Sequence, residues 1–331
     1  MNIVVIKDNK PGHYNQSFAV AETLNQMSNG KILSVDVEIR KISKYILRFL
    51  LNGKITRVWL GKYFKKEWLW FFYKIGKQIK ETPDIVVSSG RDTSLLTALF
   101  GLIYGAKTLF IGNPKKLDHM LFTSVLTILD LQLENQIVLD TVPSRPLNSN
   151  MEIFCHTYKL DQKKTYYTLL IGGDGAGYQY NEEEYDTLIK FVNSTSKNVN
   201  WLVTTSRRTP ERLEAKMQQE METAVFIAYN REPKKVISDF LALSEMIFVT
   251  EESASMVSES VGAQKQVATL VPKIAKPEKA YQQILEQLVD KKRICRYRIS
   301  SLAYEDVDEC MCEPLQRTSE EELKEKLQWL F

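Results

Sequence analysis

A histidine follows the first apolar segment of the chain, where it could act as a base. Residues 2–6 have the apolar character of a buried parallel strand, and the chain then reads Asp8-Asn-Lys-Pro-Gly-His-Tyr-Asn-Gln16. Histidine side chains exchange protons near neutral pH, so His13 could take the proton of an acceptor hydroxyl. Asp8 is close enough in sequence to orient the ring. The alternative is a histidine that only stabilises the turn.

A second loop of this kind reads Ser88-Ser-Gly-Arg-Asp-Thr-Ser94, where an expected strand becomes an expected helix. Gly90 allows the backbone to approach a ligand closely, and Arg91 could pair with a carboxylate or a phosphate. An ordinary turn with a capped helix explains the same residues equally well.

The second half of the chain opens with a glycine-rich segment, Gly172-Gly-Asp-Gly-Ala-Gly177, after an expected strand over residues 166–171. Glycines at the end of a strand let backbone N–H groups approach a phosphate or a base. We therefore expect Gly172 and Gly173 to contact a bound nucleotide.

A pair of arginines follows the next expected strand, in Thr204-Thr-Ser-Arg-Arg-Thr-Pro210. The guanidinium groups of Arg207 and Arg208 suit a diphosphate at the carboxyl end of a strand. A solvated helix start, capped by Ser206 or Thr209, is the alternative.

The segment Thr250-Glu-Glu-Ser-Ala-Ser-Met-Val-Ser-Glu259 combines several groups that suit a nucleotide. Ser253 and Ser255 stand at the start of an expected helix, where hydroxyls and free N–H groups can bind pyrophosphate oxygens. Glu259 follows about a turn later and could accept hydrogen bonds from ribose hydroxyls. A capping role explains one of these serines but not the whole group.

One pattern in the chain is typical of metal-dependent sugar transfer. Asp306-Val-Asp308 matches a DxD motif, but it stands late in the chain, in an acidic run outside any expected strand-end loop. We therefore expect no metal site.

These segments belong to two successive arrays of alternating strands and helices. The first array opens with the strand over residues 2–6, and the second with the strand over 166–171. Residues 141–150, with two prolines, two serines and two asparagines, are typical of a linker. We expect an α/β fold of two Rossmann-like, doubly wound domains, residues 1–150 and 151–331, facing a central cleft.

The charge of the chain is concentrated in one segment. Residues 40–80 contain twelve Lys or Arg, one acid and ten aromatic residues, although the net charge of the whole chain is only +3. This composition indicates contact with an anionic membrane surface. A packed helix with lysines facing water, or a nucleic-acid site, would use the same residue types; we expect no nucleic acid. We find no signal peptide and no apolar run long enough to span a bilayer, and so expect a cytoplasmic, peripheral protein.

Taken together, the motifs resemble one family, the bacterial glycosyltransferases related to the plant mitochondrial-fission protein Elongated Mitochondria, which include lipooligosaccharide outer-core transferases. The matching motifs are Lys10-Pro-Gly-His-Tyr-Asn-Gln16, Ser89-Gly-Arg91, Gly112-Asn-Pro114, Leu170-Ile-Gly-Gly173, Thr205-Ser-Arg-Arg-Thr-Pro210 and Thr250 to Glu259. The family usually has Asp where this chain has Glu252, and its Pro-x-His-Asp stretch is missing around residues 121–130. The resemblance implies a GT-B-like fold and a nucleotide-sugar donor, with no cofactor and no obligatory metal.

The resulting hypothesis is a glycosyltransferase that acts on a lipid-linked or cell-surface glycan at the inner face of a membrane. His13 and Asp8 would be catalytic. The donor site would consist of Gly172, Gly173, Ser206, Arg207, Arg208, Thr209, Glu252, Ser253, Ser255, Met256 and Glu259. The acceptor side would consist of Asn15, Gln16, Gly90, Arg91 and Asn113. The rival hypothesis is a non-catalytic adaptor that retains the fold and recruits a partner at a membrane.

Overall fold

A computed structural model describes residues 1–40, 42–75, 81–302 and 312–331 of the chain. The described chain forms two compact units, called unit 1 (residues 1–146 and 319–331) and unit 2 (residues 147–318). The assignment of the C-terminal tail to the second domain is therefore wrong. Leu323 and Leu327 of the tail are buried in the same apolar cluster as Ile3 and Val5 of the first strand, which fixes the tail to unit 1.

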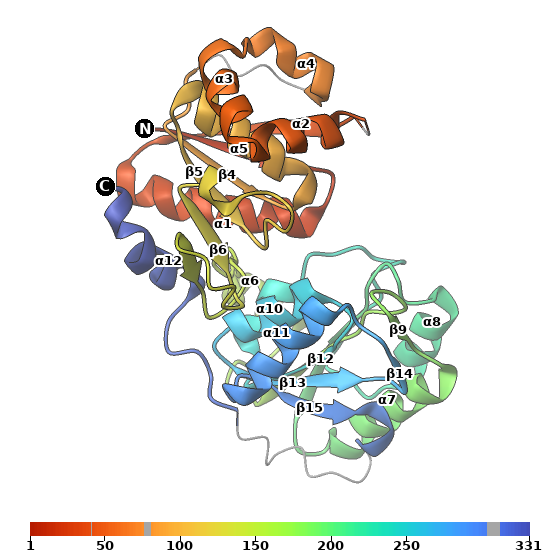
Figure 1. The fold of residues 1–331 in the computed structure, drawn as a ribbon. Helices are drawn as coiled ribbons and strands as arrows, with labels where there is room; N and C mark the ends of the chain where they lie inside the picture. The colour runs from red at the N-terminus through yellow and green to blue at the C-terminus, as the bar shows by residue number, and fades with distance from the viewer. Residues whose placement is uncertain (41, 76–80, 303–311) are drawn as a thin grey trace. The chain divides into compact units, whose positions relative to one another are not determined.

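Unit 1 is built on a seven-stranded sheet, which is parallel except for one antiparallel edge strand. Across the sheet the strands are β3 (Tyr73–Ile75), β2 (Lys31–Ile39), β1 (Asn2–Lys7), β4 (Ile85–Ser89), β5 (Lys107–Ile111), β6 (Ser124–Thr127) and β7 (Gln136–Val138). The central strands β1, β4 and β5 are buried over most of their length because helices cover both faces of the sheet (Figure 1).

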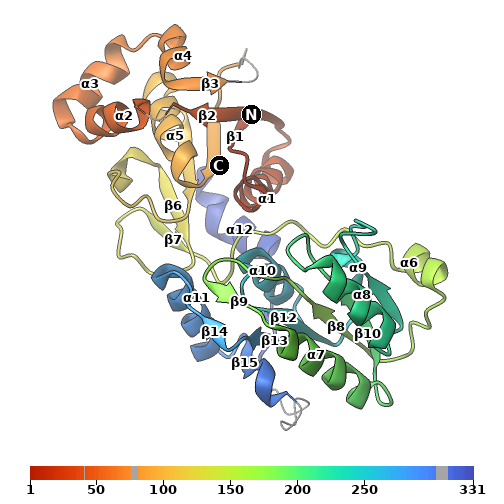
Figure 2. The same ribbon diagram turned by 90° about the vertical axis from the view of Figure 1, so that its right-hand side faces the viewer.

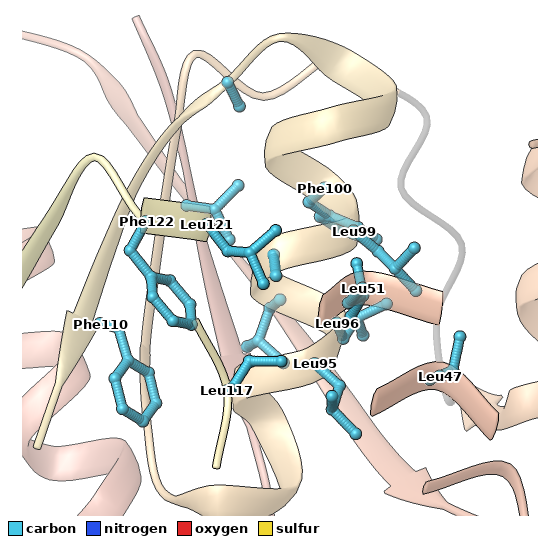
Figure 3. Packing of buried hydrophobic residues seen from close by; sticks show 14 of the residues in the cluster. Leu47, Leu51, Leu95, Leu96, Leu99, Phe100, Phe110, Leu117, Leu121 and Phe122 are labelled. Carbon is cyan, nitrogen blue, oxygen red and sulfur yellow. The ribbon is translucent and has the colours of Figure 1, made fainter. Parts of the chain in front are cut away.

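The helices of unit 1 divide between the two faces of this sheet. They are α1 (Pro11–Ser28), α2 (Ser43–Asn52), α3 (Lys54–Tyr63), η1 (Lys66–Trp68), α4 (Leu69–Phe72), α5 (Arg91–Tyr104), η2 (His119–Leu121), α12 (Ser319–Leu327) and η5 (Gln328–Leu330). Ile3 and Val5 of β1 pack with α1 and α12, whereas Val4 and Ile6 point to the opposite face, where α5 and α2 lie. Figure 3 shows leucines of α2 and α5 meeting Phe110 of β5 and Phe122 in this second cluster.

Unit 2 contains a six-stranded, fully parallel sheet. Across the sheet the strands are β11 (Val225–Ile227), β10 (Asn200–Thr204), β8 (Tyr166–Leu170), β12 (Met246–Thr250), β13 (Gln266–Val271) and β15 (Cys295–Arg298). β15, which the sequence pattern did not predict, pairs with β13 and forms the edge of the sheet. A small antiparallel pair, β9 (Tyr178–Gln179) and β14 (Ile274–Ala275), lies outside this sheet.

The helices of unit 2 connect these strands and cover the sheet (Figure 2). They are α6 (Met151–Tyr158), α7 (Glu182–Thr195), α8 (Glu211–Glu220), α9 (Ile237–Leu243), α10 (Ala254–Gly262), α11 (Lys279–Asp290) and η3 (Ile299–Ser301). Leu169 packs with α7 and α8, while its neighbour Leu170 packs with α10 and α11 on the other face. The two-unit, Rossmann-like α/β architecture expected from the sequence is confirmed.

Each sheet has a point at which its strand order reverses. In unit 1 the chain runs outward from β1 to β2 in one direction and from β4 to β5 in the other. In unit 2 the same reversal occurs between β8 and β12. Loops separate at such a point, and ligands of open α/β sheets bind there, beyond the carboxyl ends of the strands. The two reversal points therefore locate the candidate sites.

Candidate functional site

The reversal point of unit 1 holds a carboxylate–histidine pair. Asp8 follows β1, and His13 lies in the first turn of α1, which Pro11 opens with the fixed φ that suits this position. His13 Nδ1 lies 2.7 Å from Asp8 Oδ2, and Asp8 Oδ1 accepts a 3.1 Å hydrogen bond from the Lys10 N–H. A carboxylate on Nδ1 favours the tautomer that leaves Nε2 as the acceptor. The pair is thus arranged for Nε2 to take a proton.

The loop after β4 fixes one side of this histidine. A Cβ added at Gly90 would lie 2.2 Å from His13 Nδ1, and Gly90 has a φ of +95°, so a larger residue would both clash and be strained. Beside it, the Ser89 hydroxyl donates a 2.9 Å hydrogen bond to Gln16 Oε1. The structure therefore brings together four of the residues expected from the sequence, Asp8, His13, Gln16 and Gly90.

Three other residues expected on the acceptor side do not contact the Asp8–His13 pair through any hydrogen bond of the described residues. Asn15 and Arg91 are exposed, and Asn113 uses its side-chain oxygen to accept a 2.7 Å hydrogen bond from the Lys115 N–H in the turn after β5. Asn113 thus has a local structural role in this turn. Arg91 lies at the first position of α5, next to Asp92.

The reversal point of unit 2 is organised around a buried carboxylate. The side chain of Glu252 is fully buried and accepts hydrogen bonds from the Tyr180 hydroxyl at 2.7 Å and from Arg208 Nη2 at 2.8 Å. It also accepts a 3.3 Å hydrogen bond from the Gly173 N–H. Burial raises the pKa of this carboxyl above its ordinary value, although Tyr180 and Arg208 oppose the shift. Glu252 therefore anchors Arg208 at the end of the sheet.

Gly172 and Gly173 serve close packing in this structure. A Cβ at Gly172 would lie 1.5 Å from Glu252 Oε1, and one at Gly173 would lie 2.4 Å from the Arg208 carbonyl oxygen. Their N–H groups, which we expected to face a phosphate, donate to Thr250 Oγ1 and to Glu252 instead. The glycines are thus required so that Arg208 and Glu252 can approach the end of β8.

The arginine loop between β10 and α8 is held from several sides. Thr209 is buried, and its hydroxyl donates to the Gly172 carbonyl oxygen, while the Asn230 side chain donates a 2.8 Å hydrogen bond to the Thr209 carbonyl oxygen. The Ser206 hydroxyl accepts a 3.2 Å hydrogen bond from the Arg208 N–H. Arg207 projects into solvent, and a third of the Arg208 side chain is exposed. The loop therefore presents two guanidinium groups from a fixed backbone.

The start of α10 completes the polar groups at this edge of the sheet. Ser253 is at the N-cap position without a side-chain capping bond, and its hydroxyl lies 3.3 Å from that of Ser255. Met256 is buried and packs in the core, on the side of the helix away from solvent. Glu259 is half-buried, and its side chain forms no hydrogen bond or ion pair with any residue that the structure describes. Burial raises the pKa of its carboxyl.

Sequence reasoning missed the role of several residues at this site. Tyr180 and Asn230 carry no motif, and only the folded chain shows that they hold Glu252 and the arginine loop. Glu251 is also buried, and Arg296 donates to it through Nε and Nη2, each at 2.7 Å. The adjacent glutamates after β12 were the signal in the sequence that could have pointed to these contacts. Glu251 binds Arg296 of β15, and Glu252 binds Arg208.

No group of three or more metal-binding side chains is formed by residues 1–40, 42–75, 81–302 and 312–331. Asp306-Val-Asp308 lies outside the described residues. Within the same part of the chain, no helix combines the length and the apolar character needed to cross a membrane.

Solved structures with the same architecture come from several enzyme classes. UDP-GlcNAc 2-epimerase from Methanocaldococcus jannaschii, in complex with UDP-GlcNAc and UDP, is 13% identical, with a TM-score of 0.54 over 99% of this chain and 100% of the other. MurG from Acinetobacter baumannii is 10% identical, with a TM-score of 0.50 over 98% and 94%. A glycosyl transferase family 9 protein from Veillonella parvula is 12% identical, with a TM-score of 0.50 over 99% and 96%. At such identities these likenesses show the fold that GT-B glycosyltransferases share with the epimerases.

The family is identified by a comparison of the sequence with family models. No curated protein matches the chain significantly. The family model described as mitochondrial fission ELM1 matches residues 11–325, which include His13 and the polar groups at the reversal point of unit 2. The chain belongs to the mitochondrial fission ELM1 family.

Proposed function

We propose that the protein is a glycosyltransferase that uses a nucleotide-sugar donor. The observation that carries this proposal is the arrangement at the reversal point of unit 2, where Arg208 is anchored by buried Glu252 beside exposed Arg207. Two guanidinium groups on a fixed loop, next to the serine hydroxyls at the start of α10, suit a diphosphate. The half-buried carboxylate of Glu259 is available to accept hydrogen bonds from ribose hydroxyls.

The proposed chemistry uses one base and a diphosphate leaving group. His13 Nε2 takes the proton of the acceptor hydroxyl, and the hydroxyl oxygen forms a bond to the anomeric carbon of the sugar. The bond from that carbon to the diphosphate oxygen breaks, and its electron pair leaves with the nucleoside diphosphate. Arg207, Arg208, Ser253 and Ser255 stabilise the developing charge, as a metal ion does in other enzymes, so no metal is required.

The acceptor proposed is a lipid-linked or cell-surface glycan, met at the cytoplasmic face of a membrane. α2 and α3 each carry apolar side chains on the surface, and Ile42, Phe49 and Ile55 are 77%, 76% and 87% exposed. Among the described side chains of this segment, the exposed apolar ones are Ile42, Tyr45, Ile46, Phe49, Ile55, Val58, Trp59, Tyr63 and Phe71, here called the apolar surface of unit 1. Apolar helix faces flanked by Lys and Arg bind anionic lipid surfaces.

This surface differs in part from the one expected. Among the aromatic residues of the segment, Tyr73 is fully buried, and Phe64 and Phe72 pack against the core of unit 1. Trp68 is half-buried and stacks on Trp59, with ring centroids 6.1 Å apart. The lipid-facing role is therefore proposed for the exposed set alone, which also fits the rival function of an adaptor that docks at a membrane.

A ligand screen followed by a transfer assay tests this function. We expect a UDP-, GDP- or ADP-sugar, and not a CMP-sugar, which has a single phosphate, to raise the Tm of the protein. The Arg207→Ala/Arg208→Ala double variant should lose that shift. Arg212→Ala is the matched control, because Arg212 is an exposed arginine of α8 that pairs with Glu182 at the surface. A donor that binds and is consumed only with an added lipid-linked acceptor supports transfer. Conversion of the sugar without an acceptor would indicate an epimerase, and no binding of any donor would favour the adaptor.

Liposome flotation tests the membrane surface separately. Replacing Phe49 and Ile55 with Ser should reduce binding to anionic vesicles at low salt, because these side chains are exposed and contribute little to the core. Ile153→Ser is the control, since Ile153 of α6 in unit 2 is 65% exposed but lies outside this surface. Unchanged flotation of the Phe49→Ser/Ile55→Ser variant would contradict membrane contact through α2 and α3.

A further inference from the structure

Three cationic side chains surround one carboxylate beside the candidate base. Lys44 Nζ lies 2.7 Å from Asp92 Oδ1. Burial of Asp92 opposes its ionisation, but the hydrogen bond from Lys44 and the nearby charges of Lys44, Lys10 and Arg91 lower the pKa of this carboxyl. The three cations therefore lie near one another. With Asp8, which accepts a hydrogen bond from the Lys10 N–H, two carboxylates stand against three cations, so one positive charge is left over.

The charge left over is available to a ligand. Lys10 and Arg91 are exposed, and within the described residues neither forms a side-chain hydrogen bond or a salt bridge. Both belong to loops that meet at the Asp8–His13 pair: Lys10 lies between these two residues in the chain, and Arg91 follows Gly90, where an added Cβ would lie 2.2 Å from His13 Nδ1. A multiply charged anion placed here would lie next to the base.

α2 links this charged group to the apolar surface of unit 1. Its inward side chains, Leu47 and Leu51, are buried with the leucines of α5 (Figure 3), so its orientation on the unit is fixed. Lys44 lies in the first turn of α2, between Ile42 and Tyr45, which are 77% and 72% exposed. One turn of helix therefore has an ammonium group paired with Asp92, two residues after Gly90, and apolar groups facing solvent.

We propose that Lys10, Lys44 and Arg91 form a subsite for the phosphate group of a membrane lipid. The apolar chain of that lipid would lie along the exposed side chains of α2, Tyr45, Ile46 and Phe49. This inference rests on the proposed function, because the lipid phosphate would be the anchor of the acceptor whose hydroxyl meets His13. Basic residues are attracted to any anionic surface. The subsite would in addition favour lipids that end in a phosphate or diphosphate. Charge-assisted hydrogen bonds to the phosphate oxygens supply this selectivity.

Flotation with two kinds of vesicle tests the subsite in the full-length protein. Both are made of phosphatidylcholine, one with phosphatidic acid, a lipid phosphomonoester, and one with phosphatidylglycerol, a phosphodiester, at matched surface charge. We expect the wild type to prefer the phosphomonoester by about tenfold, as two charge-assisted bonds allow. The Lys10→Gln/Arg91→Gln variant should lose this preference and still bind both vesicles through α2 and α3. Lys54→Gln/Lys62→Gln, which removes two exposed lysines of α3, should weaken binding to both vesicles and keep the preference.

Other outcomes overturn the proposal. Equal binding of the wild type to the two vesicles, or an unchanged preference in Lys10→Gln/Arg91→Gln, would remove the subsite. Binding of inorganic phosphate without vesicles, at millimolar concentrations or below and abolished by the same variant, would identify a free-phosphate site and would contradict the lipid source. The donor screen is independent of these measurements. A protein that prefers the lipid phosphate but binds no nucleotide-sugar would refute the proposed function and leave the subsite standing.

Discussion

Arg208 Nη2 and Glu252 Oε1 lie 2.8 Å apart, although 44 residues separate them in the chain. The carboxylate is completely buried, whereas a third of the arginine side chain remains exposed. A buried charge needs its partner more than an exposed one does, because its own hydration has been lost. The pair therefore has two separable roles, since Arg208 satisfies Glu252 and Glu252 holds Arg208 in place for a ligand.

The first prediction separates these roles by comparing the two neighbouring arginines. Arg208→Ala should lower the free energy of unfolding by roughly 1–3 kcal/mol, because it leaves Glu252 without its cation. Arg207→Ala should change it by less than about 0.5 kcal/mol, since Arg207 is exposed. Urea unfolding of each variant measures the difference. In the Arg208→Ala/Glu252→Gln variant much of the lost stability should return, and equal stability of the two single variants would show that the ion pair contributes nothing.

The second prediction concerns the contact between Gly90 and His13. Gly90→Ala should displace the His13 ring, because the new Cβ would lie 2.2 Å from Nδ1. Gly112→Ala is the matched control, since Gly112 has a similar φ of +108° but open space around its Cβ position. Both variants pay the strain of a positive φ, roughly 1–2 kcal/mol. NMR of the histidine ring protons should show a shift of the His13 signals in the first variant only.

The fold was largely predictable because its strongest signals are local. Buried parallel strands such as β1 and β12 read as apolar runs, and the loops after them carry glycine, serine and charged residues. β15 was not predicted because its four residues, Cys-Arg-Tyr-Arg, are too few and too charged to form an apolar run like those of β1 and β12. α12 was assigned to the wrong unit because an amphipathic pattern shows that a helix packs but not on which sheet.

The candidate site was predictable only in part, because its support comes from distant residues. Asp8 and His13 are near neighbours in sequence, and the turn alone suggested their pairing. Tyr180 meets Glu252 across 72 residues. Nothing in a single sequence identifies such a contact. Likewise, the exposed and buried aromatic residues of the basic segment alternate irregularly, and only the packing of α2 and α3 separates them.

The third prediction uses the uncompensated carboxyl of Glu259. Burial raises its pKa above the ordinary value of 4.5, so the folded state binds the proton more tightly than the unfolded chain does. This contribution to stability is fully present below pH 4.5 and is lost as the pH rises through the folded pKa. Glu259→Gln should therefore raise the Tm at pH 7–8 and leave it nearly unchanged at pH 4. A variant less stable than the wild type at pH 8 would show that the carboxylate has a stabilising partner.

The fourth prediction concerns metal ions. Arg207 and Arg208 are proposed to neutralise the leaving diphosphate, so transfer should continue in the presence of EDTA once the donor is identified. The measurement is the rate of nucleoside diphosphate release before and after chelation. Loss of activity that manganese restores would instead assign a role to Asp306-Val-Asp308, and replacing both aspartates with Asn would then abolish it.

The last prediction concerns His13, on which the proposed mechanism depends. Asp8 holds Nδ1 at 2.7 Å, which leaves Nε2 as the atom that takes a proton. General bases contribute roughly 10²–10⁴-fold to rate, so His13→Ala should lower kcat by about this factor. Donor affinity should remain nearly unchanged, because the proposed donor contacts are in unit 2.

Two further variants distinguish a base from a residue that only shapes the loop. His13→Asn keeps a polar side chain beside Asp8 but cannot accept a proton at neutral pH, so it should be as slow as His13→Ala. Asp8→Asn should retain the fold of the loop and lower kcat less, because the imidazole remains but loses its orienting charge. Turnover of His13→Asn near the wild-type rate would make Asp8 the next candidate base. A loss of donor binding in His13→Ala, with kcat retained at saturation, would instead show that the loop after β1 binds the nucleotide.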